Sequence, residues 1–197
     1  MKKLIVILTV FIFILIGLLF AGFFDNTNTI ELAKEQSIYF TDERPNSSDS
    51  DIIVCIPAAY SSKEGIIGHY STGKGRKGAS DYRYTTIHLD GNTHFQQASL
   101  VRNNTPKTFS DKRLRYRRAL CQKNGRHSIV QSKRPVTLSQ FSSQLADYDN
   151  AWNLDMGTYS YGWYKDESGL HHLGISTFWN KHKQTNWIIV RKNGGNL

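Results

Sequence analysis

The first candidate for a catalytic residue is an aspartate that directly follows an apolar run. Asp155 comes immediately after Ala151–Leu154, which is predicted to be a short strand, and Gly157 lies two residues further on. A carboxylate delivered to the end of a strand can take part in acid–base catalysis. The alternative is a turn aspartate, whose side chain accepts hydrogen bonds from neighbouring backbone N–H groups.

A group of arginines is the second such feature. Four of them are interleaved with Leu114 and Tyr116: Arg113, Arg115, Arg117 and Arg118. On a strand, alternate residues share a face, so the first three would present their guanidinium groups together. A basic face of this kind can bind phosphate groups, and the alternative is an ordinary solvated surface.

The overall charge also indicates an anionic partner. The 197 residues include 25 Lys and Arg against 16 Asp and Glu, a formal net charge of +9 at pH 7. The chain has no DNA- or RNA-binding motif and begins with a signal for export, so we expect no nucleic-acid partner. An acidic glycan, a sugar phosphate or an anionic lipid headgroup would satisfy the same electrostatics.

A glycine-rich loop, Gly73–Gly78, matches the letters of the dinucleotide-binding pattern G-x-G-x-x-G. That pattern needs a strand before it and a helix after it, whereas the next segment, Tyr82–Leu89, is predicted to be a strand. We therefore expect no nucleotide cofactor. The loop is either a mobile basic surface loop or a small anion site made of backbone N–H groups with Lys74, Arg76 and Lys77.

The spacing of the histidines gives no support for a metal site. Seven histidines are scattered along the chain, and no pair has the H-x-x-x-H or H-E-x-x-H spacing typical of zinc ligands. We expect neither a metal nor any other cofactor.

The two cysteines, Cys55 and Cys121, allow two interpretations. Outside the cytoplasm such a pair tends to oxidise where geometry permits, and a disulfide here would join two predicted strands. The alternative is two buried thiols that pack as small apolar side chains. Because a pair of cysteines carries no information on its own separation, both interpretations stay open.

The elements that position these residues are mostly strands. Ile52–Ile56 is a continuous apolar run typical of a buried strand, and Trp187–Val190 is another. Two hairpins are predicted, with turns at Asp90–Asn92 and Lys123–Gly125.

One helix is predicted from a capping box, with Thr137 at the N-cap and Gln140 three residues on. Leu138, Phe141 and Leu145 then fall on one helical face. The fold class that we expect is α+β: a single domain with a mixed, largely antiparallel sheet and few helices, preceded by a hydrophobic N-terminal segment.

That N-terminal segment predicts export. Lys2 and Lys3 precede Leu4–Phe24, an uncharged run close to the roughly 20 residues that span a bilayer. The run is either an uncleaved membrane anchor or a cleaved signal peptide. In both cases the positive-inside rule places residues 25–197 outside the cytoplasm, in the cell envelope or secreted.

The predicted organisation has four parts. Residues 1–24 are the signal peptide or anchor, and residues 25–51 are a polar linker in which Asn46–Ser50 is a flexible spacer. Residues 52–192 form the domain, and residues 193–197 are a tail. The sequence does not indicate an oligomeric state.

The stretch from Ala151 to Ser160 resembles the Asn-Leu-Asp-Gly-Gly-Gly-Ser-Ser motif of the phosphodiester glycosidase family. Arg117–Leu120 resembles the family's Arg-Thr-Ala-Ile strand, and Thr185–Val190 resembles its closing Ala-Asn-x-Ile-x-Val strand. The order of these motifs agrees with the family over roughly residues 52–192.

The resemblance implies a site for a phosphate-linked sugar. In it, Asp155 is the catalytic carboxylate near the anomeric carbon, and Arg117 holds the phosphate. The residues that the resemblance implies for substrate binding are Asn153, Gly157, Ser160 and Asn186. No metal is implied.

The sequence also departs from the family pattern. Pro57–Tyr60 replaces an Asn-Gly-Gly-aromatic element, and Met156 replaces the first glycine after Asp155. Alanine cannot adopt all the backbone conformations that glycine allows. The function expected is an exported or membrane-anchored protein that hydrolyses or binds phosphate-linked sugars of envelope or exogenous glycans. The alternative is a non-catalytic envelope protein that binds acidic glycan or has a structural role.

We predict that the protein fractionates with membranes, because Leu4–Phe24 is long enough to span a bilayer and a large residue, Leu19, stands where signal cleavage favours a small one. Membrane fractionation followed by N-terminal sequencing checks this. A mature N-terminus near residue 22–26 in the soluble fraction would contradict the anchor but leave export intact.

Overall fold

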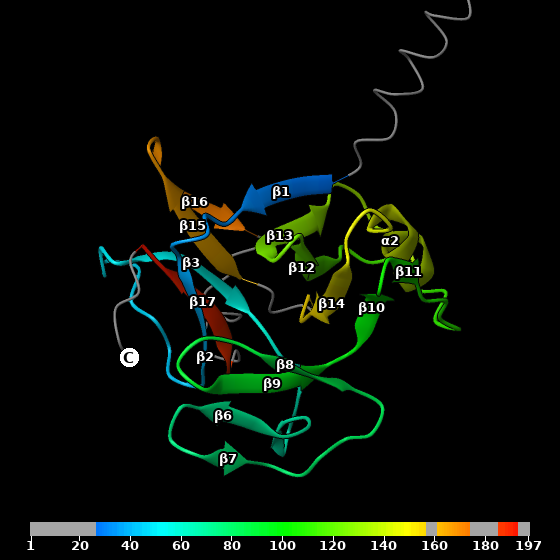
Figure 1. Ribbon diagram of the computed structural model, residues 1–197, viewed down its shortest axis with the longest axis horizontal. Coiled ribbons are helices and arrows are strands. Elements are labelled where there is room, and N and C mark those ends of the chain that lie inside the picture. The colour runs from blue at the N-terminus through cyan, green and yellow to red at the C-terminus, as the bar shows by residue number, and fades with distance from the viewer. Residues whose placement is uncertain (1–26, 157–160, 174–184, 193–197) are drawn as a thin grey trace, which may run out of the picture.

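The computed structural model describes residues 27–156, 161–173 and 185–192. These residues form three antiparallel sheets and one short two-stranded ribbon. In Figure 1 the six-stranded sheet lies at the upper right, the five-stranded sheet at the left and the four-stranded sheet below. All three sheets contribute to one apolar core, for example through Leu120, Ile56 and Phe95 respectively. The three sheets therefore belong to a single domain.

The six-stranded sheet has the order β1-β13-β12-β14-β10-β11. Its strands are β1 (Thr27–Glu31), β10 (Ser99–Arg102), β11 (Thr105–Pro106), β12 (Arg118–Lys123), β13 (Arg126–Ser132) and β14 (Asn150–Leu154). The hairpin predicted around Lys123–Gly125 joins β12 to β13. Asn124 and Gly125 have φ values of 52° and 73°, which a tight two-residue hairpin turn requires.

The five-stranded sheet has the order β16-β15-β3-β17-β2. Its strands are β2 (Ser37–Thr41), β3 (Ile52–Pro57), β15 (Gly162–Asp166), β16 (Gly169–Leu173) and β17 (Trp187–Arg191). Along β17, Ile188 and Val190 enter the shared core, while Trp187 and Ile189 pack in a second cluster on the other face. This burial on both faces explains the continuous apolar runs and confirms both predicted strands.

The four-stranded sheet has the order β7-β6-β9-β8. Its strands are β6 (Tyr70–Thr72), β7 (Arg76–Lys77), β8 (Thr85–His88) and β9 (Thr93–Gln97), and the ribbon consists of β4 (Ser61–Ser62) and β5 (Gly65–Ile66). The hairpin predicted around Asp90–Asn92 joins β8 to β9. Asp90 Oδ2 accepts a 2.7 Å hydrogen bond from the Ile38 backbone N–H, which ties this sheet to β2.

The helix α2 (Leu138–Gln144) begins with the predicted capping box. Thr137 Oγ1 accepts from the Gln140 N–H at 3.1 Å, and Gln140 Oε1 accepts from the Thr137 N–H at 2.9 Å. Phe141 packs with Cys121 and Ala151 in the core on this side of the six-stranded sheet. With one helix in the described ranges and antiparallel pairing throughout them, the predicted α+β class is confirmed.

The prediction that residues 25–51 form a linker is wrong for two parts of that segment, which are strands. β1 pairs with β13 from Thr27 to Glu31, and β2 pairs with β17 from Ser37 to Thr41. Both are edge strands, and β1 consists mostly of exposed polar residues, so it lacks the apolar alternation by which strands are recognised in a sequence. The short run Ile38–Phe40 in β2 is apolar and buried, but three residues do not distinguish a strand from one turn of helix. The domain therefore includes residues before position 52.

The disulfide interpretation of the cysteines is also wrong. Cys55 lies in β3 and Cys121 in β12, in different sheets and different apolar clusters, and both are free thiols. Burial raises the pKa of Cys55 to about 12 and also raises the pKa of Cys121. The two thiols therefore pack as small apolar side chains.

The predicted anchor, Leu4–Phe24, lies outside the described residues, and so does the predicted tail, 193–197. Within the described ranges, no helix combines the length and apolar character needed to cross a bilayer.

We predict that alkylation of the denatured, unreduced protein labels both cysteines, since neither is oxidised. In the folded protein at pH 8, neither thiol should react within minutes, because burial keeps Cys55 and Cys121 protonated and inaccessible. Mass spectrometry of the labelled protein checks both statements. If neither cysteine of the denatured protein were labelled, the disulfide interpretation would be correct.

Candidate functional site

A cavity of about 440 Å³ lies where the end of β14 meets the chain before β12 and the chain after β3. Asn153 and Asp155 line it from β14, Arg117 from the start of β12, and Tyr60 from the segment after β3. The loop 109–116 and residues 83–84 complete the wall. The cavity therefore draws on segments of all three sheets.

The pairing of β12 with β14 brings the predicted catalytic residues together. Arg118 pairs with Leu154, so the next position places Arg117 beside Asp155. Residues opposite one another on antiparallel strands point to the same face, and Asn153 shares that face with Asp155. Three of the residues expected from the sequence therefore line one cavity.

Arg117 is almost fully buried, with 7% of its surface exposed. Its Nε donates to the carbonyl oxygen of Val136 at 3.3 Å, and its Nη2 donates to that of Arg113 at 2.9 Å. Burial lowers the pKa of Arg117, although a guanidinium stays protonated in proteins. These bonds fix the orientation of the guanidinium without neutralising its charge.

Asn153 and Tyr60 form the polar floor of the cavity. Asn153 Nδ2 donates to Tyr60 Oη and also to the Leu154 carbonyl oxygen. The Asn153 Oδ1 atom is buried and has no hydrogen-bond partner in the part of the chain that the structure describes. An unpartnered buried acceptor is costly, so this oxygen is suited to accept a hydrogen bond from a ligand hydroxyl.

The position of Asp155 is fixed through its backbone, whose N–H donates to the Ala58 carbonyl oxygen at 2.9 Å. Burial, and then the charge of Asp155, raise the pKa of Tyr60 to about 12, and Arg117 opposes this shift. Tyr60 is therefore a neutral hydrogen-bond donor at physiological pH. Asp155 and Arg117 therefore both lie within electrostatic reach of Tyr60.

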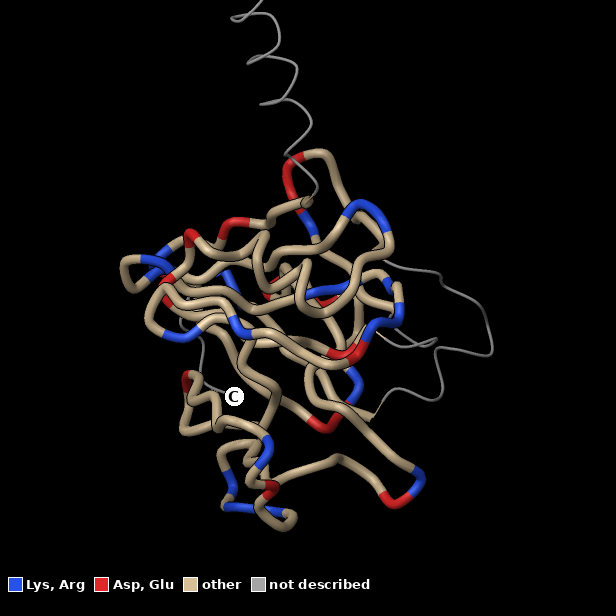
Figure 2. Tube along the Cα trace, turned by 90° about the vertical axis from the view of Figure 1, so that its right-hand side faces the viewer, with Lys and Arg blue, Asp and Glu red and all other residues tan. Residues whose placement is uncertain are grey.

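The other arginines of the cavity differ in their pairing. Arg113 forms two hydrogen bonds to Asp111, at 2.8 and 2.9 Å, and Arg83 pairs with Asp81. Side-chain hydrogen bonds from these arginines lower the pKa of Asp111, and that of Asp81 to about 2. In Figure 2, which views the molecule from the right-hand side of Figure 1, acidic and basic positions lie next to one another on several loops. Arg115 and Arg117 have no such acidic partner in the described ranges.

Arg118 is completely buried beneath the cavity, on the other face of β12. Its Nε and Nη2 both donate to Gln131 Oε1, at 3.1 and 2.8 Å, while its Nη1 has no partner. Burial lowers the pKa of Arg118 to about 10, and the charge of Asp155 opposes this shift. The carboxylate of Asp155 thus favours the charged form of this buried cation.

Asn186 does not line the cavity. Its Oδ1 accepts from the Ala59 N–H at 2.7 Å, and its Nδ2 donates to the Ala59 carbonyl oxygen at 3.2 Å and to Ser61 Oγ at 3.1 Å. Asn186 therefore holds the backbone next to Tyr60, and its direct role in substrate binding stays a prediction. Gly157 and Ser160, also predicted to bind substrate, lie outside the described residues.

Sequence reasoning missed Tyr60 as a site residue. The only signal was its place as the aromatic residue at the end of Pro57–Tyr60, which replaces the family's Asn-Gly-Gly-aromatic element. Ala58 and Ala59 in that segment are buried against the core.

Comparison with known proteins supports the fold. No protein-family profile matches the chain, and no curated protein matches it. Its structure is similar to the catalytic domain of zebrafish N-acetylglucosamine-1-phosphodiester alpha-N-acetylglucosaminidase, solved in a form auto-inhibited by its pro-peptide, with a TM-score of 0.58. The match covers 84% of this chain and 82% of that chain at 10% sequence identity. The chain therefore shares the fold of a phosphodiester glycosidase domain.

We predict that Asn186→Ala lowers the free energy of unfolding by about 2–3 kcal/mol, because it leaves two buried backbone groups of Ala59 without partners. The matched control is Thr185→Ala, which removes an exposed hydroxyl and should change stability by less than about 0.5 kcal/mol. Urea denaturation measures both variants. Equal effects of the two substitutions would contradict the structural role of Asn186.

Proposed function

We propose that this protein is a phosphodiester-glycosidase-like hydrolase that acts on sugar-1-phosphodiesters. The observation that carries the proposal is the meeting of Asp155, Arg117 and the unpartnered Oδ1 of Asn153 in one cavity. The shared fold of a phosphodiester glycosidase domain supports it. The natural first substrate to examine is an N-acetylglucosamine-1-phosphodiester, because that is what the similar zebrafish enzyme is named for.

The chemistry requires few groups. Cleavage of the bond between the anomeric carbon and the phosphate oxygen develops positive charge on the sugar and negative charge on the leaving phosphate monoester, and water then adds to the anomeric carbon. A carboxylate such as Asp155 can stabilise or attack the anomeric carbon. An arginine such as Arg117 can hold the leaving phosphate through charge-assisted hydrogen bonds. Because a phosphate is a weakly basic leaving group, its departure does not depend on a strong general acid.

The charge of the cavity suits a phosphodiester. Aspartates neutralise Arg113 and Arg83, which leaves Arg115 and Arg117 to oppose the single carboxylate of Asp155. A phosphodiester carries one negative charge, so it balances this small excess of positive charge. A polyanion would require more unpaired cations than the cavity offers.

The polar floor suits a sugar. Asn153 already uses its amide N–H groups, so its free Oδ1 can bind only a hydrogen-bond donor such as a sugar hydroxyl. Tyr60 remains protonated and can donate to a sugar oxygen or to a phosphate oxygen. The proposed ligand therefore has its sugar at the floor and its phosphate beside the arginines.

The location proposed for this reaction is outside the cytoplasm, on envelope or exogenous glycans. The proposal rests on the export signal expected from Leu4–Phe24, which would also attach the protein to the membrane.

A specific observation favours a second candidate, a non-catalytic protein that binds acidic glycan. Ala58 and Ala59 stand where the related family has glycines, and both are buried and held by Asn186 and Asp155. A segment fixed in this way cannot approach a substrate as a flexible glycine backbone can. The same cavity would then bind its ligand without hydrolysing it.

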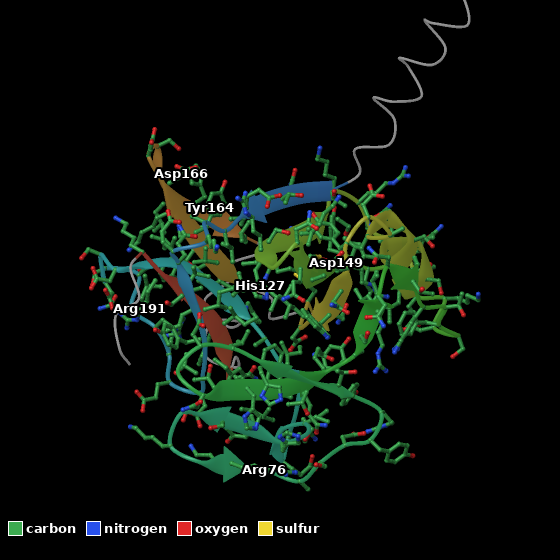
Figure 3. The ribbon with its side chains drawn as sticks, viewed as in Figure 1. Arg76, His127, Asp149, Tyr164, Asp166 and Arg191 are labelled. Atoms are coloured by element: carbon green, nitrogen blue, oxygen red, sulfur yellow. The ribbon has the colours of Figure 1, made fainter. Side chains whose placement is uncertain are left out.

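We predict that Asp155→Asn reduces hydrolysis of a sugar-1-phosphodiester by at least about a hundredfold, the scale of acid–base contributions. The matched control is Asp149→Asn at the opposite end of β14 (Figure 3), where Asp149 Oδ2 accepts a 2.7 Å bond from the Asn124 N–H. That control loses a turn interaction worth about 1 kcal/mol and keeps its activity. Initial rates, normalised to the folded fraction by circular dichroism, compare the variants.

Two outcomes would contradict the proposal in different ways. Full activity of Asp155→Asn would remove Asp155 from the catalytic step. Binding without hydrolysis by the wild-type protein, across a panel of sugars, would favour the non-catalytic candidate.

A further inference from the structure

One strongly exposed aromatic side chain lines the cavity, and two further exposed apolar residues neighbour lining residues in the sequence. Among the described residues, four large apolar side chains are strongly exposed: Tyr82 at 96%, Leu114 at 64%, Tyr116 at 50% and Leu170 at 43%. Tyr116 lines the cavity, Leu114 lies between two lining arginines, and Tyr82 precedes the lining residue Arg83. Only Leu170, in β16, belongs to another part of the molecule. Exposed apolar residues grouped in this way commonly mark a binding surface.

The chain before β12 runs from the buried floor of the cavity to its open edge. Arg117 is 7% exposed, Tyr116 is 50% exposed and Leu114 is 64% exposed. The phosphate-binding position therefore lies deeper than the apolar side chains. A phosphodiester with its sugar at the floor and its phosphate at Arg117 would extend its remaining substituent toward the exposed part of this segment, where Tyr116 lines the cavity.

The charges along this path also restrict that substituent. Arg113 is neutralised by Asp111, and Arg83 is neutralised by Asp81. Beyond Arg117, Arg115 is the one lining arginine without an acidic partner in the described ranges, so a second anionic group would meet a single positive charge. The exposed side chains of Tyr116 and Leu114 add aromatic and aliphatic surface in the same segment.

We infer that the leaving group of the substrate carries an apolar chain, so that the protein acts on lipid-linked sugar phosphodiesters. This inference rests on the proposed function and adds to it the class of leaving group. The apolar chain would lie on Leu114 and Tyr116 while the phosphate is held by Arg117. A nucleoside leaving group is the competing occupant, because aromatic side chains can also stack on a base.

The test measures binding of phosphodiesters that contain no sugar, so the result does not depend on the identity of the sugar. The full-length protein in lipid nanodiscs is titrated with dimethyl phosphate, methyl octyl phosphate and the methyl phosphodiester of uridine. Methyl octyl phosphate should bind at least about tenfold more tightly than dimethyl phosphate, since burial of two methylenes is sufficient for that gain.

A matched pair of variants distinguishes binding of the octyl chain to the proposed surface from partition of that chain into the lipid of the nanodisc. Leu114→Ser should reduce the octyl preference to about twofold, because the chain loses its main aliphatic contact. Leu170→Ser removes an equally ordinary exposed leucine on β16 and should retain the full preference. Partition into lipid affects both variants equally, so the difference between them reports on the cavity edge.

Several results would overturn the inference. Equal affinity for the methyl and octyl ligands, or an octyl preference that survives Leu114→Ser, would remove the apolar chain from this surface. A preference for the uridine ligand over the octyl ligand would assign a nucleoside instead. If sugar phosphodiesters are hydrolysed at the same rate with methyl and octyl leaving groups, this inference fails while the proposed function stands. If no phosphodiester binds, both fail.

Discussion

The arrangement of the cavity depends on the segment Ala58–Tyr60, which follows β3 and is held by side-chain and backbone hydrogen bonds and not by pairing with another strand. Asn186 binds both backbone groups of Ala59, and the Asp155 N–H binds the Ala58 carbonyl oxygen. These bonds join the end of β3, the end of β14 and the start of β17 at one point. Because Tyr60 follows directly, the same bonds set the distance between the phenol and the carboxylate. The cavity exists because these strand ends cannot separate.

The second constraint is the buried charge of Arg118. Its guanidinium is fully enclosed, and among the described residues it donates hydrogen bonds to the neutral Gln131 alone, an arrangement that is costly without a nearby anion. Asp155 provides that anion at the boundary between core and cavity. The carboxylate therefore lines the cavity and also compensates a charge of the core.

Local patterns in the sequence were sufficient to predict those elements whose structure is determined by a few neighbouring residues. The capping box at Thr137 and the turn at Asn124 are examples, as are the apolar runs of β3 and β17. Edge strands such as β1 were missed because half-exposed polar residues leave no apolar pattern. The site was only partly predictable. The contact of Asn153 with Tyr60 spans 93 residues, and that of Asn186 with Ala59 spans 127, so no local spacing reveals either.

The place of β17 has a consequence for biosynthesis. It lies between β3 and β2 in the five-stranded sheet, yet it is the last described strand to leave the ribosome. Until it arrives, β2 and β3 present unpaired backbone groups and apolar faces to solvent, a state prone to aggregation. The nascent chain thus needs protection through nearly its whole synthesis. Truncation before Trp187 would remove the middle of a sheet, so the shortened chain becomes a substrate for proteases.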